Sequence, residues 1–186
     1  MKSSGTLAAA SSLRIVLVPV IMALIAIDDD DIGSLAVIAG VLFVLAALTD
    51  FFDGYLARRW NMTTTLGSFL DTTADKLLVS GALIALVDVG RASAWIAAII
   101  VGRELLILGL RGAVAAEGTV FPPSIWGKLK TNVQFIAIFL AIVQWGGDIG
   151  PLRLDEWALL AAAVITVVSA VEYIARFSSA LREGAN

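Results

Sequence analysis

Four aspartates lie in one short stretch between two strongly apolar segments of the chain. Asp50 and Asp53 are three residues apart and Asp71 and Asp75 are four apart, so each pair would share one face of a helix. Four carboxylates gathered at the edge of a membrane repel one another and resist desolvation. Two hard divalent cations would resolve this conflict, and Mg²⁺ bound beside phosphates is the usual occupant of such a site. The spacing therefore predicts metal-assisted phosphate chemistry.

Small residues and a cation accompany the aspartates. Gly54 and Gly67 lack side chains, so a flat or phosphate-bearing ligand can approach the backbone there. Arg58 follows on the same helix and supplies a cation for phosphate oxygens. Any single aspartate at a helix end could equally be a cap or an interfacial polar group. The whole set together favours a functional site.

The composition restricts both the environment of the protein and its chemistry. Of its 186 residues, 59% are hydrophobic and 16% are charged, and the mean hydropathy is +0.92, which is typical of an integral membrane protein. Cys and His are both absent, which excludes disulfides, thiol nucleophiles and imidazole bases. The net charge of −3 and the lack of a basic run give no support for a nucleic-acid partner.

Six apolar segments have the length of about 20 residues that a membrane-spanning helix needs. The first has Lys2 and Arg14 ahead of its apolar core but lacks a small-x-small cleavage site, so we interpret it as an uncleaved span. We expect an all-α integral membrane protein, a six-transmembrane-helix bundle in a single domain over residues 1–186. The expected spans are roughly 7–27, 34–56, 68–88, 93–113, 124–145 and 155–177.

The basic residues indicate how the bundle lies in the membrane. Most lysines and arginines fall at one set of helix ends, and only Arg91 and Arg153 fall at the other. By the positive-inside rule, both chain termini and the aspartate stretch face the cytoplasm. The connectors on the other side are acidic, and we expect the run from Asp28 to Asp31 to form a solvated outer loop.

A second group of charged residues lies on the fourth and fifth spans. Arg103 and Arg111 are eight residues apart, which places them near one face of a helix, and Lys128 and Lys130 begin the next span. Charges within spans are costly and usually functional. A pocket lined by these four cations would suit an acceptor that carries its own phosphate. Each lysine taken alone also fits ordinary anchoring at the cytoplasmic surface.

The stretch from Asp50 to Asp75 reads D-x-x-D-G-x-x-A-R, then eight residues, then G-x-x-x-D-x-x-x-D. It resembles the signature of the CDP-alcohol phosphotransferase family at every fixed position. The resemblance implies a six-span enzyme, usually a homodimer, with a polar cavity open to the cytoplasm. The matching residues are Asp50, Asp53, Gly54, Ala57, Arg58, Gly67, Asp71 and Asp75.

The resemblance also implies a role for each of these positions. The four aspartates would hold two divalent metals, Mg²⁺ or Mn²⁺, and Asp75 would also take the proton from the attacking alcohol. The positions of Gly54, Ala57 and Gly67 would line the cytidine pocket, and Arg58 would contact the diphosphate.

Two further motifs bear on the acceptor alcohol. Arg103-Glu104-x₆-Arg111 and the later Gly-Lys-x-Lys-Thr-x-x-Gln at 127–134 resemble the branch of the family that uses glycerol 3-phosphate. That branch would transfer the phosphatidyl group of CDP-diacylglycerol in the cytoplasmic membrane by direct displacement, giving phosphatidylglycerophosphate and CMP. An inositol phosphate or another alcohol remains an alternative acceptor, and a divalent-cation transporter is the non-enzyme alternative.

Overall fold

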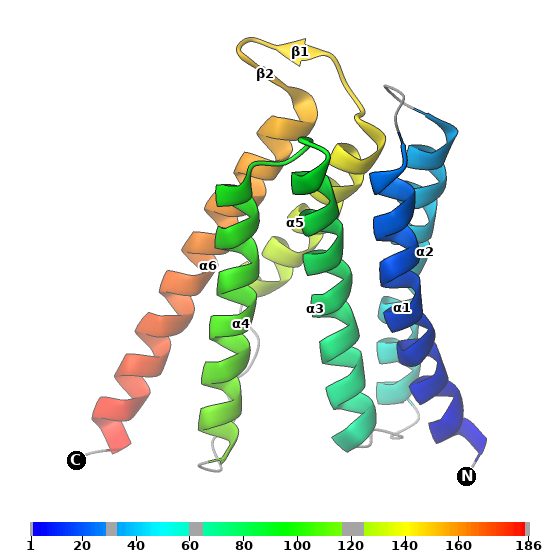
Figure 1. Ribbon diagram of the computed structural model, residues 1–186. Coiled ribbons are helices and arrows are strands. Elements are labelled where there is room, and N and C mark those ends of the chain that lie inside the picture. The colour runs from blue at the N-terminus through cyan, green and yellow to red at the C-terminus, as the bar shows by residue number, and fades with distance from the viewer. Residues whose placement is uncertain (1, 29–32, 60–64, 117–124, 185–186) are drawn as a thin grey trace.

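The computed structural model describes the backbone of residues 2–28, 33–59, 65–116 and 125–184, without the side chains of 2–11, 50–59, 179–184 and some other helix-end positions. This part of the chain forms six helices and one short hairpin (Figure 1). The helices are α1 (Lys2–Ala26), α2 (Ser34–Arg59), α3 (Thr65–Asp88), α4 (Ala94–Ala116), α5 (Ile125–Val143) and α6 (Leu154–Gly184). Strands β1 (Asp148–Ile149) and β2 (Leu152–Arg153) pair antiparallel between α5 and α6. Each expected span thus falls on one helix.

Local chemistry explains where several helices begin and end. Gly90, with a φ of 74°, follows α3 in the left-handed conformation that commonly ends a helix. The N–H of Arg91 then donates to the carbonyl of Leu86 over 2.8 Å. At the start of α6, the carboxylate of Glu156 accepts from the N–H of Arg153 over 2.8 Å, which satisfies a donor near the helix terminus.

The helices form a closed ring in the order α1, α3, α4, α6, α5 and α2, and α3 also touches α5. Both chain termini lie at one end of the bundle and the hairpin lies at the other (Figure 1). The last turns of α2 and the first turns of α3, which carry the aspartate stretch, are at the same end as the termini.

A buried apolar core fills the bundle. Its largest fully buried side chains include Ile25, Phe43, Leu86 and Ile138, which come from four different helices. Helices α1 and α3 approach closely at Gly81, where an added Cβ would lie 2.5 Å from Cγ1 of Val18. Only a glycine allows this separation without a shift, so this position sets how tightly the two helices pack.

The outer surface of the bundle is also apolar, as expected for a protein in lipid. Large hydrophobic side chains such as Leu45, Leu105 and Val171 are about half exposed on three of the helices. Within the described residues, the segment Leu154–Ser178 of α6 is the one long and apolar enough to cross a membrane by itself. Ionisable residues interrupt the apolar sequence of α3 and α4. The fold is therefore all-α with apolar helices, and six membrane crossings stay a prediction.

The expectation of a solvated loop is wrong for Asp28. This residue is buried, and its Oδ2 accepts from Nη2 of Arg91 over 2.9 Å. Its Oδ1 accepts from the N–H of Ala36, in the first turn of α2, over 3.1 Å. Arg91 also donates to the carbonyl of Ile142 at the end of α5 over 3.4 Å. Asp28 and Arg91 therefore join the α1–α2 connector, the α3–α4 connector and the end of α5. Asp29, Asp30 and Asp31 lie outside the described residues.

We expect Asp28→Asn to lower the stability of the bundle by about 3 kcal/mol, the usual cost of removing one partner from a buried ion pair. The substitution leaves the Arg91 guanidinium buried without its counter-charge. Thermal unfolding of the purified protein in detergent would measure the loss as a lower Tm.

The matched control is Asp148→Asn, which changes an exposed carboxylate at the same end of the molecule. It should leave the Tm within experimental error of the unsubstituted protein. Equal Tm values for the two variants would mean that the Asp28–Arg91 pair does not stabilise the fold.

Candidate active site

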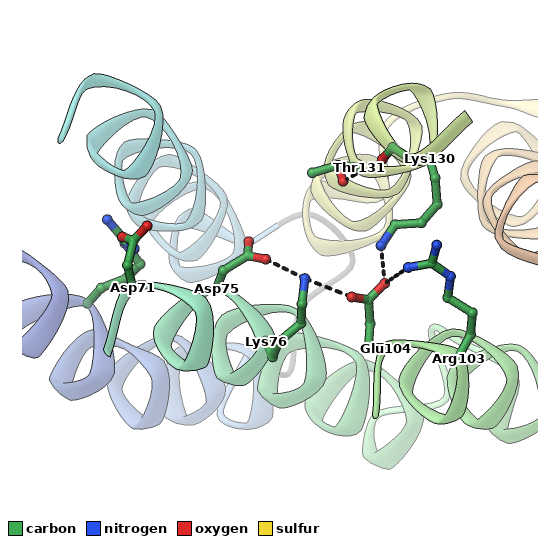
Figure 2. A network of polar contacts seen from close by, with 9 residues as sticks. Asp71, Asp75, Lys76, Arg103, Glu104, Lys130 and Thr131 are labelled. Atoms are coloured by element: carbon green, nitrogen blue, oxygen red, sulfur yellow. Dashed lines mark hydrogen bonds and ion pairs between the residues drawn. The ribbon is translucent and has the colours of Figure 1, made fainter. Parts of the chain in front are cut away.

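Helix α3 carries both described aspartates of the motif. Asp71 and Asp75 are one helical turn apart, and their carboxylates project from the same side of α3 (Figure 2). Oδ1 of Asp71 accepts from Nη1 of Arg14 over 3.3 Å. Arg14 belongs to α1 and is 2% exposed, so a buried guanidinium holds this carboxylate in place. The α1–α3 contact thus positions one of the four predicted metal ligands.

Lys76 connects Asp75 to the interior of the bundle. Its Nζ lies 2.6 Å from Oδ2 of Asp75 and 2.7 Å from Oε2 of Glu104 on α4 (Figure 2). Charge-assisted contacts of this length are strong and directional. Lys76 therefore holds the Asp75 carboxylate and links it to a second carboxylate on the neighbouring helix.

Glu104 is the centre of this polar network. The side chain is 2% exposed and contacts three cations. Its Oε2 faces Lys76, whereas its Oε1 accepts from Nζ of Lys130 on α5 and from Nη1 of Arg103 over 3.4 Å. Three cations and two carboxylates, including Asp75, leave the cluster with one net positive charge. A buried site with this balance can receive an anion.

The two arginines of α4 both turn toward α6 but contact different residues. Nη2 of Arg103 donates to Oγ of Ser169 over 2.7 Å. Arg111 lies two turns further along α4, with its guanidinium 5.8 Å from the ring centroid of Tyr173. Arg111 is exposed, whereas Arg103 is mostly buried. Arg103 and Lys130 therefore meet at Glu104, and Arg111 lies apart from them.

Several predicted site residues have no described side chain. The five that lie between residues 50 and 58 have their backbone in α2, as expected, and Lys128 has its backbone in α5. Gly67 lies in the first turns of α3. Among the described residues, no group of three or more acidic side chains gathers in a way that would hold a metal. The predicted site residues of which the structure describes only the backbone are Asp50, Asp53, Gly54, Ala57, Arg58 and Lys128.

Sequence reasoning placed Glu104 in a motif beside Arg103 but gave no separate role to it, to Lys76, to Arg14 or to Ser169. Lys76 directly follows a predicted metal ligand, and Glu104 directly follows a predicted phosphate-binding arginine. The spacing of Lys76 and Glu104 from other charged residues does not indicate a role of their own, although an ionisable residue inside an apolar run indicates function in general. Arg14 and Ser169 are far from their partners in the sequence, 57 and 66 residues away, so only the packing of the helices brings them together.

Comparison with known proteins gives one family. Residues 8–168 match the family model for CDP-alcohol phosphatidyltransferase. A CDP-diacylglycerol–glycerol-3-phosphate 3-phosphatidyltransferase of Bacillus subtilis is 37% identical, with 91% of this chain and 93% of the relative aligned. A probable phosphatidylglycerophosphate synthase of Mycobacterium tuberculosis is 41% identical over 88% of this chain and 77% of its own.

A second CDP-diacylglycerol–glycerol-3-phosphate 3-phosphatidyltransferase, from Rickettsia typhi, is 38% identical over 86% of this chain and 89% of the relative. The similarity therefore covers the aspartate stretch, the Glu104 network and most of the six helices. The chain belongs to the CDP-alcohol phosphatidyltransferase family.

Proposed function

We propose that this enzyme transfers the phosphatidyl group of CDP-diacylglycerol to glycerol 3-phosphate and releases CMP. Relatives named for this reaction align with most of the chain. The observation that carries the proposal is the cationic cluster around Glu104, which Lys76 connects directly to Asp75. An acceptor phosphate bound at Arg103 and Lys130 would present its hydroxyl toward the aspartate side of the cluster.

The reaction needs one group to remove a proton and no covalent intermediate on the protein. The sn-1 hydroxyl oxygen of glycerol 3-phosphate forms a bond to the phosphorus that carries the diacylglycerol. The bond between that phosphorus and the CMP oxygen breaks, and the hydroxyl proton passes to Asp75. Lys76 keeps the Asp75 carboxylate directed into the site. With neither Cys nor His in the chain, direct displacement is the economical route.

The aspartates fit a site for divalent cations by their chemistry. Carboxylate oxygens are the ligands that Mg²⁺ and Mn²⁺ prefer, and Asp71 and Asp75 present theirs on one side of α3. Asp50 and Asp53 would complete the set from the end of α2. When bound, the two cations supply Lewis-acid polarisation of the phosphorus and stabilise the charge on the leaving CMP. Gly54, Ala57, Arg58 and Gly67 would hold the cytidine diphosphate.

We further propose six membrane crossings, with the active site and both termini on the cytoplasmic side. Exposed tryptophans support one membrane boundary, because Trp95, Trp145 and Trp157 all lie near the hairpin end of the bundle. Trp126 is exposed near the opposite end. In this arrangement the CDP-lipid keeps its acyl chains in the bilayer. A homodimer, the usual state implied by the family resemblance, completes the proposal.

Purified protein should release CMP from CDP-diacylglycerol about tenfold faster with glycerol 3-phosphate than with inositol phosphate, serine or phosphatidylglycerol. Each alcohol is offered in turn with Mg²⁺ or Mn²⁺, and CMP is measured. Chelation with EDTA should abolish release, and added Mg²⁺ should restore it. Faster release with inositol phosphate would assign that acceptor instead. Cation flux into proteoliposomes without CMP release would favour the transporter.

Asp75→Asn should lower kcat by about a thousandfold, because a general base contributes roughly that factor and an amide cannot accept the proton. The measurement is CMP release by protein whose Tm confirms that it is folded. Asp88→Asn is the control, since it changes an exposed carboxylate on the same helix. A fully active Asp75→Asn enzyme would remove the assignment of the base.

Arg111→Ala and Lys128→Ala should each raise the KM for glycerol 3-phosphate about tenfold and change the KM for CDP-diacylglycerol less than twofold. Each substitution removes a cation predicted to attract the acceptor phosphate. Arg176→Ala serves as the control, because Arg176 is engaged with Glu172 on α6 over 2.6 Å. Equal increases in both KM values would mean that these cations do not select the acceptor.

A further inference from the structure

Glu104 stands out because no step of the proposed reaction uses it. It lies in the middle of α4, is among the most buried charged residues described, and comes within ion-pair distance of three cations. Placing a carboxylate there costs several kcal/mol of desolvation unless partners compensate. If Glu104 had no further role, a leucine or an alanine at this position would avoid that desolvation cost.

The two oxygens of Glu104 face different parts of the site. Oε2 lies 2.7 Å from Lys76, which in turn lies 2.6 Å from Asp75. Oε1 accepts from Lys130 and Arg103, the two buried cations of the predicted acceptor pocket. Figure 2 shows Glu104 between these groups, with Asp75 and Lys76 on one side and Arg103 and Lys130 on the other. One rigid carboxylate therefore fixes the positions of both sets relative to each other.

Electrostatics explains why the arrangement needs this carboxylate. Lys76, Arg103 and Lys130 come from three helices and would repel one another in a buried site. Glu104 lets the three cations stay close, and together with Asp75 it neutralises two of their three positive charges. The remaining excess is available to a phosphate that arrives as a dianion.

We propose that Glu104 is the positioning residue that couples the acceptor-phosphate site to the reacting centre. It holds Lys130 and Arg103 for the phosphate through one oxygen and holds Lys76 against Asp75 through the other. The inference rests on the proposed function, since it assumes that Asp75 and these cations act on one acceptor. Glu104 itself contacts neither the acceptor nor the CDP-lipid.

Glu104→Gln should raise the KM for glycerol 3-phosphate at least about tenfold and lower kcat at least about tenfold. The KM for CDP-diacylglycerol should stay within about twofold. Lys76→Met breaks only the branch toward Asp75, so it should lower kcat and leave the KM for glycerol 3-phosphate nearly unchanged. Glu104→Asp keeps the charge and should recover part of both losses.

A binding measurement distinguishes positioning from general stability. Glycerol 3-phosphate with Mg²⁺ should raise the Tm of the unsubstituted protein and of Asp28→Asn, which loses a buried carboxylate at the opposite end of the bundle. Glu104→Gln should lose this ligand-dependent rise. If Glu104→Gln does not fold, Glu104→Asp tests the same point, with a KM for glycerol 3-phosphate raised severalfold.

Three results would overturn the inference. The first is a Glu104→Gln protein whose KM for glycerol 3-phosphate and ligand-dependent rise in Tm both equal those of the unsubstituted protein. The second is an equal increase in the KM for glycerol 3-phosphate and the KM for CDP-diacylglycerol. The third is a loss of activity in Asp28→Asn as large as that in Glu104→Gln. Failure of the proposed function is distinguishable, because it appears in the unsubstituted protein. If that protein uses another alcohol, the same comparison is made with that alcohol. An unsubstituted protein that releases CMP with none of the alcohols would overturn both the proposed function and this inference.

Discussion

The Glu104 carboxylate and the three cations around it form the interaction on which the active end of the bundle depends. Each member comes from an apolar helix, and none would be stable at its depth without the others. The network therefore also fixes the relative positions of α3, α4 and α5. A hydrophobic contact could not do this, because it has no directional requirement comparable to that of a short ion pair.

The two ends of the bundle use buried charge for different purposes. Near the hairpin, Asp28 and Arg91 satisfy each other, and they also bond to the backbone N–H of Ala36 and the carbonyl of Ile142. At the other end, the Glu104 network keeps a net positive charge, and Asp71 keeps its carboxylate partly exposed. The first arrangement is saturated and can only stabilise the fold. The second keeps an excess positive charge among the described residues, which suits the proposed site for charged substrates.

Much of this organisation was predictable from the sequence, for physical reasons. Apolar runs of sufficient length determine where the helices lie, and the spacing of Asp71 and Asp75 places them on one face of α3. Arg103 and Lys130 meet at one carboxylate, and the pocket of Arg103, Arg111, Lys128 and Lys130 stays a prediction. What could not be predicted is pairing across helices. Asp28 resembled a solvated loop residue because Arg91, its partner, is 63 positions away.

Helices α3 and α4 combine apolar residues with ionisable side chains. Asp71, Asp75 and Lys76 lower the hydropathy of α3, and Arg103 and Glu104 do the same in the middle of α4. These helices contact each other, and each also packs against a second neighbour, α1 for α3 and α6 for α4. Their charged faces can therefore turn inward, where the charges compensate one another, and leave apolar residues such as Leu77 and Leu105 exposed outside. In the proposed arrangement of six membrane crossings, the closed ring of helices keeps these polar groups away from lipid.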